Sequence, residues 1–349
     1  MIAYILKRLL LMIPTLLGVL LVTFAVIQFV PGGPVEETLR EISAVAAGSE
    51  GGGSAGGYRA RQGVDPARVE EIKALYGFDK PAPERFWHML QGYARLDLGK
   101  SFFYHSDVWE LVKSKLPVSI SLGLWTFFLS YLISIPLGIA KAVRHGSAFD
   151  LVTSTAILVG YAIPGFVLGV VLLVLFGGGS FLQLFPLRGL TSDNWAELSL
   201  IGKVLDYLWH IALPVTASVV GSFAVVTMLT KNTFLEEFRK QYVQTARAKG
   251  LSERKLLYKH VFRNAMIPLV TGFPAAFIGA FFTGSLLIET LFSLDGLGLL
   301  SYEAVIKRDY PVVMGTLYLF TVIGLITKLV TDLCYVLVDP RVQFESMGR

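Results

Sequence analysis

Long apolar stretches separated by polar segments dominate this chain from end to end. A helix needs about 20 predominantly apolar residues to cross roughly 30 Å of bilayer hydrocarbon. The chain has six stretches that meet this requirement, at about 9–30, 116–140, 151–176, 211–230, 265–290 and 312–337. This pattern predicts an all-α, polytopic membrane protein with six transmembrane helices, whose termini lie on the same side of the membrane.

The first apolar stretch shares one feature with a secretory signal peptide, because Lys7 and Arg8 precede it. It is longer than the apolar region of such a peptide, and Pro31 follows it without a small-residue cleavage motif. We therefore interpret residues 1–30 as a retained N-terminal transmembrane helix.

Lysine and arginine are concentrated on one side of the predicted spans. Lys141 and Arg144 lie between the second and third spans, and the 231–264 loop between the fourth and fifth is strongly basic. The loops on the other side, 177–210 and 291–311, are close to charge balance. Because cytoplasmic loops carry the excess of lysine and arginine, we expect both termini to be cytoplasmic.

The long segment 31–115 is extracytoplasmic in this orientation. Residues 48–57 form a flexible Gly-rich linker by composition. Asp65 followed by Pro66 predicts a helix start, and Gly77 predicts its end. Two more helical faces follow at three- and four-residue spacing, one of Phe86, Leu90 and Tyr93 and one of Val108, Val112 and Leu116.

The chain thus divides into an N-terminal helix at 1–30, a small extracytoplasmic helical insertion at 31–115, a five-helix core at 116–337 and a cytoplasmic tail at 338–349. Hydrophobic residues make up 54% of the chain and charged residues 16%, against roughly 25% charged in soluble domains. The mean hydropathy is +0.60. Composition therefore agrees with a membrane protein.

The net charge of +5 would suit a nucleic-acid partner. The basic residues are, however, concentrated in the 231–264 loop and at the chain ends. We therefore interpret the charge as a matter of membrane topology and protein docking, and expect no nucleic-acid partner.

The sequence lacks the motifs that are typical of nucleotide binding and of metal-dependent catalysis. The sequence has no GxxxxGK[ST] phosphate loop and no HExxH motif, its five histidines are far apart, and Cys334 is its only cysteine. We expect no catalytic residue, no metal and no cofactor in this chain. Lys328 and Asp332 share a helix face in the sixth span, and they indicate either a charge in a translocation pathway or a self-compensated pair near the interface.

Prolines and glycines occur within the predicted spans. Pro164, Pro268 and Pro274 each remove a backbone hydrogen bond and can bend a helix. Gly165 and Gly169 have the GxxxG spacing that permits close helix approach. Both a gating motion and ordinary packing are open as interpretations.

The basic cytoplasmic loop is far longer than a simple connection. Thr245, Ala246 and Ala248 are small, which permits close approach by a partner. Gly250 can adopt the left-handed conformation that ends a helix, and Ser252 can then cap the next one. The pattern predicts a short helix along the membrane face, joined at a sharp corner to a second. It suits either a rigid docking surface or an amphipathic segment on anionic lipid.

This loop resembles the EAA loop of binding-protein-dependent ABC importers, in the form found in dipeptide and oligopeptide permeases, through the sequence TARAKGLSERKLLYKHVFRNAMIP from Thr245. Its first Ala-Ala pair is absent, as is usual in peptide permeases. Stretches similar to that family run along nearly the whole chain: YILKRLLLMIPTLLGVLLVTF from Tyr4, PGGP from Pro31, YGFDKP from Tyr76, DLGKS from Asp97, IPLGIAKA from Ile135, HIALP from His210, IETLFSLDGLGLL from Ile288, RDYPVVMGT from Arg308 and DPRV from Asp339.

Two further features resemble one branch of that family. The Gly-rich insert before Asp65 and the FPLRGLTSDN loop from Phe185 are similar to the Yej-type permeases, which import oligopeptides and the peptide-nucleotide antibiotic microcin C. The resemblance implies the transmembrane domain of a type I ABC importer in a bacterial inner membrane, without enzymatic activity of its own. An ion-coupled secondary transporter is the alternative.

The resemblance also implies partners. These would be a second, similar permease, two cytoplasmic ATPase domains or a tandem ATPase that bind ATP and Mg, a periplasmic peptide-binding protein and the peptide itself.

Three groups of residues become site candidates. The candidates for coupling to the ATPase are Tyr242, Thr245, Ala246, Arg247, Ala248, Lys249, Gly250, Leu251 and Ser252. The candidates for gating or structural roles are Pro164, Gly165, Gly169, Pro268 and Pro274. The candidates for contact with the binding protein are Phe185, Arg188, Asp295, Arg308 and Asp309.

Overall fold

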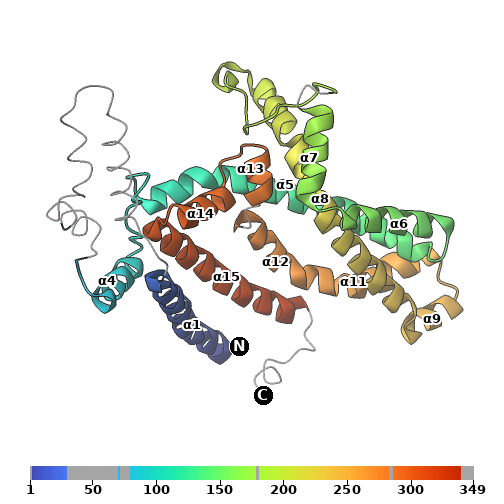
Figure 1. The fold of residues 1–349 in the computed structure, drawn as a ribbon. Coiled ribbons are helices and arrows are strands. Elements are labelled where there is room, and N and C mark those ends of the chain that lie inside the picture. Colours follow the sequence, from blue (N-terminus) through green and yellow to red (C-terminus); the bar gives the residue numbers. More distant parts are fainter. Residues whose placement is uncertain (1, 30–69, 71–78, 178–180, 283–285, 339–349) are drawn as a thin grey trace. The chain divides into compact units, whose positions relative to one another are not determined.

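The structure, a computed structural model, describes residues 2–29, 70, 79–177, 181–282 and 286–338 (Figure 1). Within these residues the regular elements are helices, apart from one isolated β-bridge between Lys100 and Asp107. The all-α prediction is therefore confirmed. Outside the described residues lie the predicted linker at 48–57, the predicted helix limits at Asp65, Pro66 and Gly77, and the tail from 339 onward.

The chain forms two compact units. The first comprises Met1–Leu6, Lys115–Leu300 and Ile323–Arg349, and the second comprises Lys7–Ser114 and Ser301–Val322. The contacts described below each lie within one of these units.

Helices long and apolar enough to cross a membrane are α1 (Ile2–Phe29), α5 (Val108–Val143), α8 (Leu200–Phe238) and α15 (Tyr310–Val338). Two bent pairs have the same character: α6 (Ala148–Ala162) with α7 (Gly165–Phe176), and the helices of Glu253–Ala265 with α12 (Ile267–Phe282). The described part of the chain thus contains four candidate spans, or six if each bent pair is one span, as predicted. Shorter helices are α4 (Ala82–Ala94), η1 (Trp195–Glu197), α9 (Gln241–Ala248), α10 (Glu253–Lys255), η2 (Leu256–Val261), α11 (Phe262–Ala265), α13 (Leu286–Leu291) and α14 (Leu297–Ile306).

The sharper bend, of 92°, separates α6 from α7. Pro164 has no N–H to continue the hydrogen bonding of α6, and its ring forces Ile163 into an extended conformation, with φ −85° and ψ 117°. The second pair bends by 49° just before Pro268. Pro274, by contrast, lies inside a continuous α12.

The GxxxG pair brings α7 against α8 at Gly165 and against α13 at Gly169. A Cβ on Gly165 would lie 3.0 Å from the carbonyl oxygen of Ala217, and one on Gly169 would lie 2.8 Å from Cδ2 of Leu291. Ordinary close packing is therefore sufficient to explain both glycines.

The two helical faces predicted for the insertion are present, the first of them within the second unit. On α4, Phe86 and Leu90 are half-buried and Tyr93 is buried. The ring of Tyr93 lies 4.9 Å from that of Tyr318. The second face begins where α5 begins, at Val108, which is fully buried.

Two apolar clusters form the core of the first unit. One joins α5, α8, α13 and the segment after it, and contains Leu122, Ile211, Leu213, Val215, Ala217, Ile288, Phe292 and Leu294. The other joins the ends of α5 and α8 to the basic loop, and contains Ala142, Phe234, Val243, Leu256, Val261 and Ala265. We call this second group the loop cluster.

Candidate functional site

The short helix α9 is the centre of the candidate site, and it begins three residues after α8 ends at Phe238 (Figure 1). Gly250 has a φ of +81°, which is the left-handed conformation expected of a residue that ends a helix. The amide of Gly250 donates to Arg247 at 3.0 Å, and that of Leu251 donates to Ala246 at 3.3 Å. The predicted helix and its stop are both present.

The corner after Gly250 differs in one detail from the prediction. Ser252 occupies the N-cap position of α10, but its side chain makes no capping hydrogen bond. Instead, Arg247 braces the corner through two bonds to Glu253, from Nε to Oε1 at 2.6 Å and from Nη2 to Oε2 at 3.0 Å. The guanidinium of Arg247 is therefore already engaged within the loop.

α9 is anchored on one side and open on the other. Val243 is fully buried in the loop cluster, whereas Thr245, Ala248 and Lys249 are exposed. Small side chains at 245 and 248 leave the helix backbone accessible to a partner. One face of α9 is thus fixed against the protein, and the other is exposed and carries small side chains.

A hydrogen-bond network around Tyr242 ties α9 to its neighbours. Its hydroxyl donates to Glu237 near the end of α8 and accepts from Nδ2 of Asn264 at 2.9 Å. Glu237 also pairs with Lys240 at 2.5 Å. Burial, and then the bond to Glu237, raises the pKa of the Tyr242 hydroxyl, which is a donor at neutral pH even without this shift.

An interior cavity of about 850 Å³ lies elsewhere in the first unit, lined by α5, α7, α8, α12 and α13. Small and hydroxyl-bearing residues are frequent in its wall, among them Ser130, Ser218 and Gly221. The buried Oγ1 of Thr126, also in the wall, has no hydrogen-bond partner among the described residues. This lining can accommodate polar groups.

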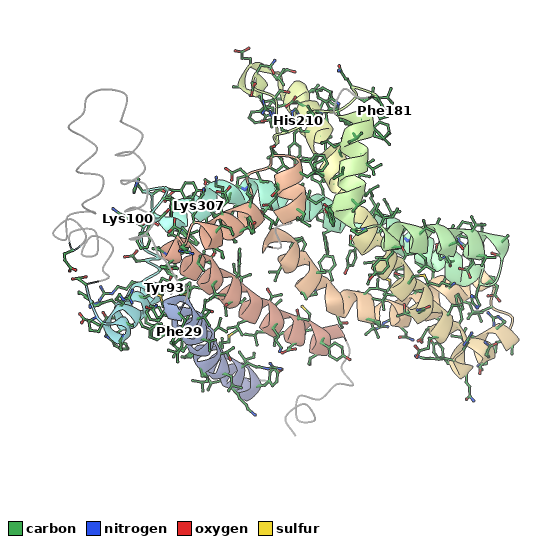
Figure 2. The ribbon with its side chains drawn as sticks, in the orientation of Figure 1. Phe29, Tyr93, Lys100, Phe181, His210 and Lys307 are labelled. Atoms are coloured by element: carbon green, nitrogen blue, oxygen red, sulfur yellow. The ribbon has the colours of Figure 1, made fainter. Side chains whose placement is uncertain are left out.

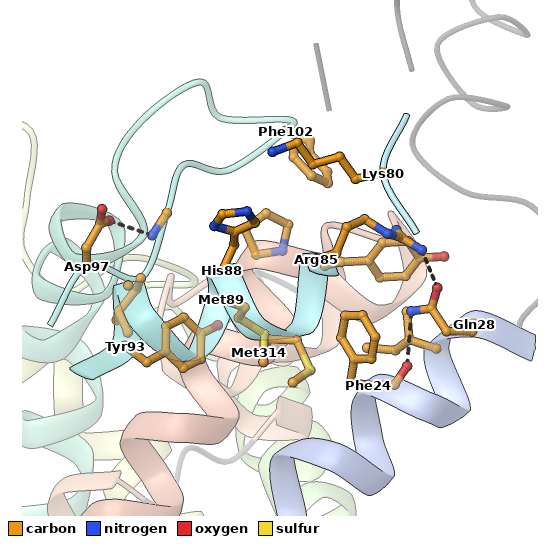
Figure 3. Close-up of a pocket in the computed structure, with 16 residues that line it drawn as sticks. Phe24, Gln28, Lys80, Arg85, His88, Met89, Tyr93, Asp97, Phe102 and Met314 are labelled. Atoms are coloured by element: carbon orange, nitrogen blue, oxygen red, sulfur yellow. Dashed lines mark hydrogen bonds between the residues drawn. The ribbon is translucent and has the colours of Figure 1, made fainter. Parts of the chain in front are cut away.

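The second unit has its own cavity of about 430 Å³, between the end of α1, α4 and the start of α15 (Figure 3). Arg85 projects along its wall and donates to Oε1 of Gln28 at 2.5 Å. Phe24, Met89 and Met314 supply apolar lining. No residue of this cavity was among the sequence-derived site candidates.

The candidates for contact with the binding protein have different surroundings. In the first unit, Phe185 packs against the core, Arg188 is exposed, and Asp295 pairs with Lys115. In the second unit, Arg308 is half-buried with a φ of 56°.

Asp309 is buried, unlike a residue on a contact surface. It is only 1% exposed, and its carboxylate accepts from Oγ of Ser101 at 2.5 Å and the amide of Phe102 at 3.2 Å. It ties the turn before α15 to the turn at Ser101 and Phe102.

Sequence reasoning missed four buried charged residues. Lys141, Asp150 and Lys231 form one ion cluster, and each looks in the sequence like an ordinary charge at the end of an apolar stretch. Glu289 lies within the predicted fifth span and is fully buried. It accepts from the amide of Leu299 at 2.8 Å, and the signal for it, a carboxylate in an apolar stretch, was available.

His210 is buried in α8 with Nδ1 2.8 Å from the carbonyl oxygen of Asp206 (Figure 2). Across the described residues no three or more His, Cys, Asp or Glu side chains are grouped so that they could hold a metal ion.

Long apolar helices and a folded basic segment between two candidate spans define the class, a polytopic α-helical membrane protein. Residues 134–344 match the family model of the binding-protein-dependent transport system inner membrane component. The chain belongs to this family.

Similar proteins match over nearly the full length. The peptidoglycan transport system permease protein YejB of Agrobacterium fabrum is 53% identical, with 98% of each chain covered. The inner membrane ABC transporter permease protein YejB of Escherichia coli O157:H7 is 54% identical, with 99% of each covered. The dipeptide transport system permease protein DppB of Escherichia coli K12 is 32% identical over 99% of this chain and 100% of its own length.

Among solved structures, an inward-facing form of the methionine ABC transporter MetNI is 17% identical with a TM-score of 0.47, covering 65% of this chain and 96% of that one. By its family model and its full-length relatives, the chain is an inner-membrane permease component of an ABC importer.

Proposed function

We propose that this permease imports oligopeptides, including peptide antibiotics such as microcin C, from the periplasm to the cytoplasm, and that α9 couples it to an ATPase. The observation that carries the proposal is the construction of α9: an inner face fixed by buried Val243 and an outer face of small, exposed residues. Peptide as the cargo is supported by relatives named for peptidoglycan and dipeptide transport.

The proposed partners are a second, similar permease, two ATPase domains or a tandem ATPase that bind ATP and Mg, and a periplasmic peptide-binding protein. Both termini of this chain would be cytoplasmic. The segment from Thr245 to Leu251 would sit in a groove of the ATPase subunit through its exposed side, which carries Thr245, Ala248 and Lys249.

In this mechanism, closure of the ATPase dimer moves α9 as a rigid element. The loop cluster joins α9 to the ends of α5 and α8 and to η2, so a displacement of α9 reaches the helices that line the interior cavity. ATP binding favours one of two states of the permease, as any ligand-driven switch requires, and hydrolysis restores the other.

The test is a bulky substitution on α9. In proteoliposomes that hold the complete transporter, Ala248→Trp, on the exposed face of α9, should keep membrane insertion and ATP hydrolysis but lower peptide uptake at least about ten-fold, because the helix no longer fits its groove. The matched control is Ala94→Trp, at the exposed end of α4, which adds the same ring on a different helix. Normal uptake by Ala248→Trp would rule out α9 as the coupling element.

A further inference from the structure

Three buried charged side chains meet where α5, α6 and α8 come together, next to the loop cluster. Lys141 is near the end of α5, Asp150 is in the first turn of α6, and Lys231 is two turns before the end of α8. Their exposed fractions are 0%, 4% and 9%. Ions buried this deeply need close partners, since leaving water is costly.

In the described part of the chain, Lys141 makes all its polar contacts with α6 and has several of them. Its Nζ lies 3.1 Å from Oδ1 of Asp150 and 2.9 Å from the carbonyl oxygen of the same residue. It also donates to Oγ1 of Thr153 at 2.8 Å and Oγ of Ser154 at 2.7 Å. Because these acceptors lie on one helix, Lys141 fixes the end of α5 to the start of α6.

Lys231 has fewer polar partners than Lys141. Its Nζ lies 2.7 Å and 2.8 Å from the two carboxylate oxygens of Asp150. Among the described residues, those two oxygens are its only hydrogen-bond acceptors. The ionic tie between α8 and α6 therefore depends on one carboxylate.

The cluster can lose Lys231 without leaving Asp150 uncompensated. Asp150 would keep Lys141, the amide of Gly146 at 3.2 Å and Nδ1 of His145 at 3.3 Å. Lys231 is the most exposed of the three charges, and a lysine stem is long enough to carry a released ammonium to water. If α5 separated from α6, by contrast, the fully buried charge of Lys141 would lose its partners.

A few packed side chains connect α9 to the Lys231–Asp150 ion pair. Phe234 lies one turn after Lys231 on α8 and is fully buried in the loop cluster beside Val243 of α9. Ala142, the residue after Lys141, belongs to the same cluster. A displacement of α9 therefore acts on both lysines, through side chains that are packed together.

We propose that Lys231 is a positioning residue for energy coupling. Its bond to Asp150 ties α8 to the α5–α6 pair in one state of the permease and opens in the other, while Lys141 holds α5 and α6 together in both. This inference rests on the proposed function, because it assumes that α9 delivers the motion.

The experiment compares Lys231→Met, which keeps the stem and removes the charge, with Lys231→Arg and Lys141→Met in the complete transporter in proteoliposomes. The readout is the number of peptides imported per ATP hydrolysed. We expect Lys231→Met to insert and to unfold at nearly the wild-type temperature, but to lower this ratio about five-fold or more. Lys231→Arg should restore the ratio, and Lys141→Met should reduce the amount of folded protein.

Two results would overturn the proposal. One is an unchanged ratio in Lys231→Met. The other is a Lys231→Met protein as unstable as Lys141→Met, because the tie would then be a permanent part of the fold. Ala248→Trp in the same assay separates the two hypotheses: if it uncouples and Lys231→Met does not, this inference alone fails, and if it transports normally, the assignment of α9 fails.

Discussion

At the scale of single residues, one hydroxyl group on Tyr242 joins three consecutive parts of the basic loop. It connects Glu237 on α8 with α9 and with Asn264 on α11. Because the carboxylate of Glu237 keeps Lys240 as a second partner, removal of the hydroxyl weakens the network without leaving a buried charge alone.

We expect Tyr242→Phe to lower the free energy of unfolding by about 1 kcal/mol, the usual contribution of one hydrogen bond. Thermal unfolding of the detergent-solubilised protein measures this change. Tyr258→Phe is the matched control, since Tyr258 is 62% exposed. Equal unfolding temperatures for the two variants would contradict a stabilising role for the network.

The residue scale also shows where sequence reasoning stops. The left-handed Gly250 followed directly from the side-chain requirements of a helix stop. Lys141 and Lys231 did not, because a lysine at the end of an apolar stretch normally reaches the interfacial water. Only the fold brings Asp150, distant in sequence from Lys231, between them.

At the scale of elements, the crossing of α5 and α8 offers a test of close packing. A Cβ added to Gly138 would lie 2.6 Å from Cβ of Thr230 and 2.8 Å from the carbonyl oxygen of Thr227. The neighbouring atoms are a branched side chain near its base and backbone, so they have little room to move. The two helices can approach this closely only with glycine at 138.

Gly138→Ala should therefore destabilise the protein by about 1–3 kcal/mol, as overpacking of a core does. Gly272→Ala on α12 is the control, because a Cβ there meets no atom within 4 Å, and an added methyl inside a helix is stabilising by roughly 0.5–1 kcal/mol. The unfolding temperatures of the two variants should move in opposite directions. A shift in the same direction for both would contradict the close approach of α5 and α8.

Element positions were largely predictable, and element geometry was not. Apolar length located α1, α5, α8 and α15, since the hydrocarbon thickness sets the length of a span. A proline, however, predicts only a lost hydrogen bond. Pro164 marks a bend of 92° while Pro274 lies in an unbroken helix, and the difference depends on the packing around each.

At the scale of the whole molecule, the central prediction concerns the source of energy. Peptide uptake by the complete transporter should fall to background when the partner ATPase is inactivated, and it should persist when the proton gradient is collapsed with ATP still present. The reason is that this chain has no phosphate loop of its own and belongs to a family of transport-system components. Uptake that follows the proton gradient instead would establish the ion-coupled alternative.

The right angle between α6 and α7 has a consequence for water. α6 has 15 residues and α7 has 12, so they are about 22 Å and 18 Å long, and each is shorter than the roughly 30 Å hydrocarbon layer. At their corner the last carbonyl groups of α6 lose their helical donors, and such groups cannot face lipid without a partner. Gly165 and Phe166, just past the corner, line the interior cavity. Hydration of that cavity would satisfy these carbonyls, so the bend that interrupts the helix also makes the interior of the permease a place for water.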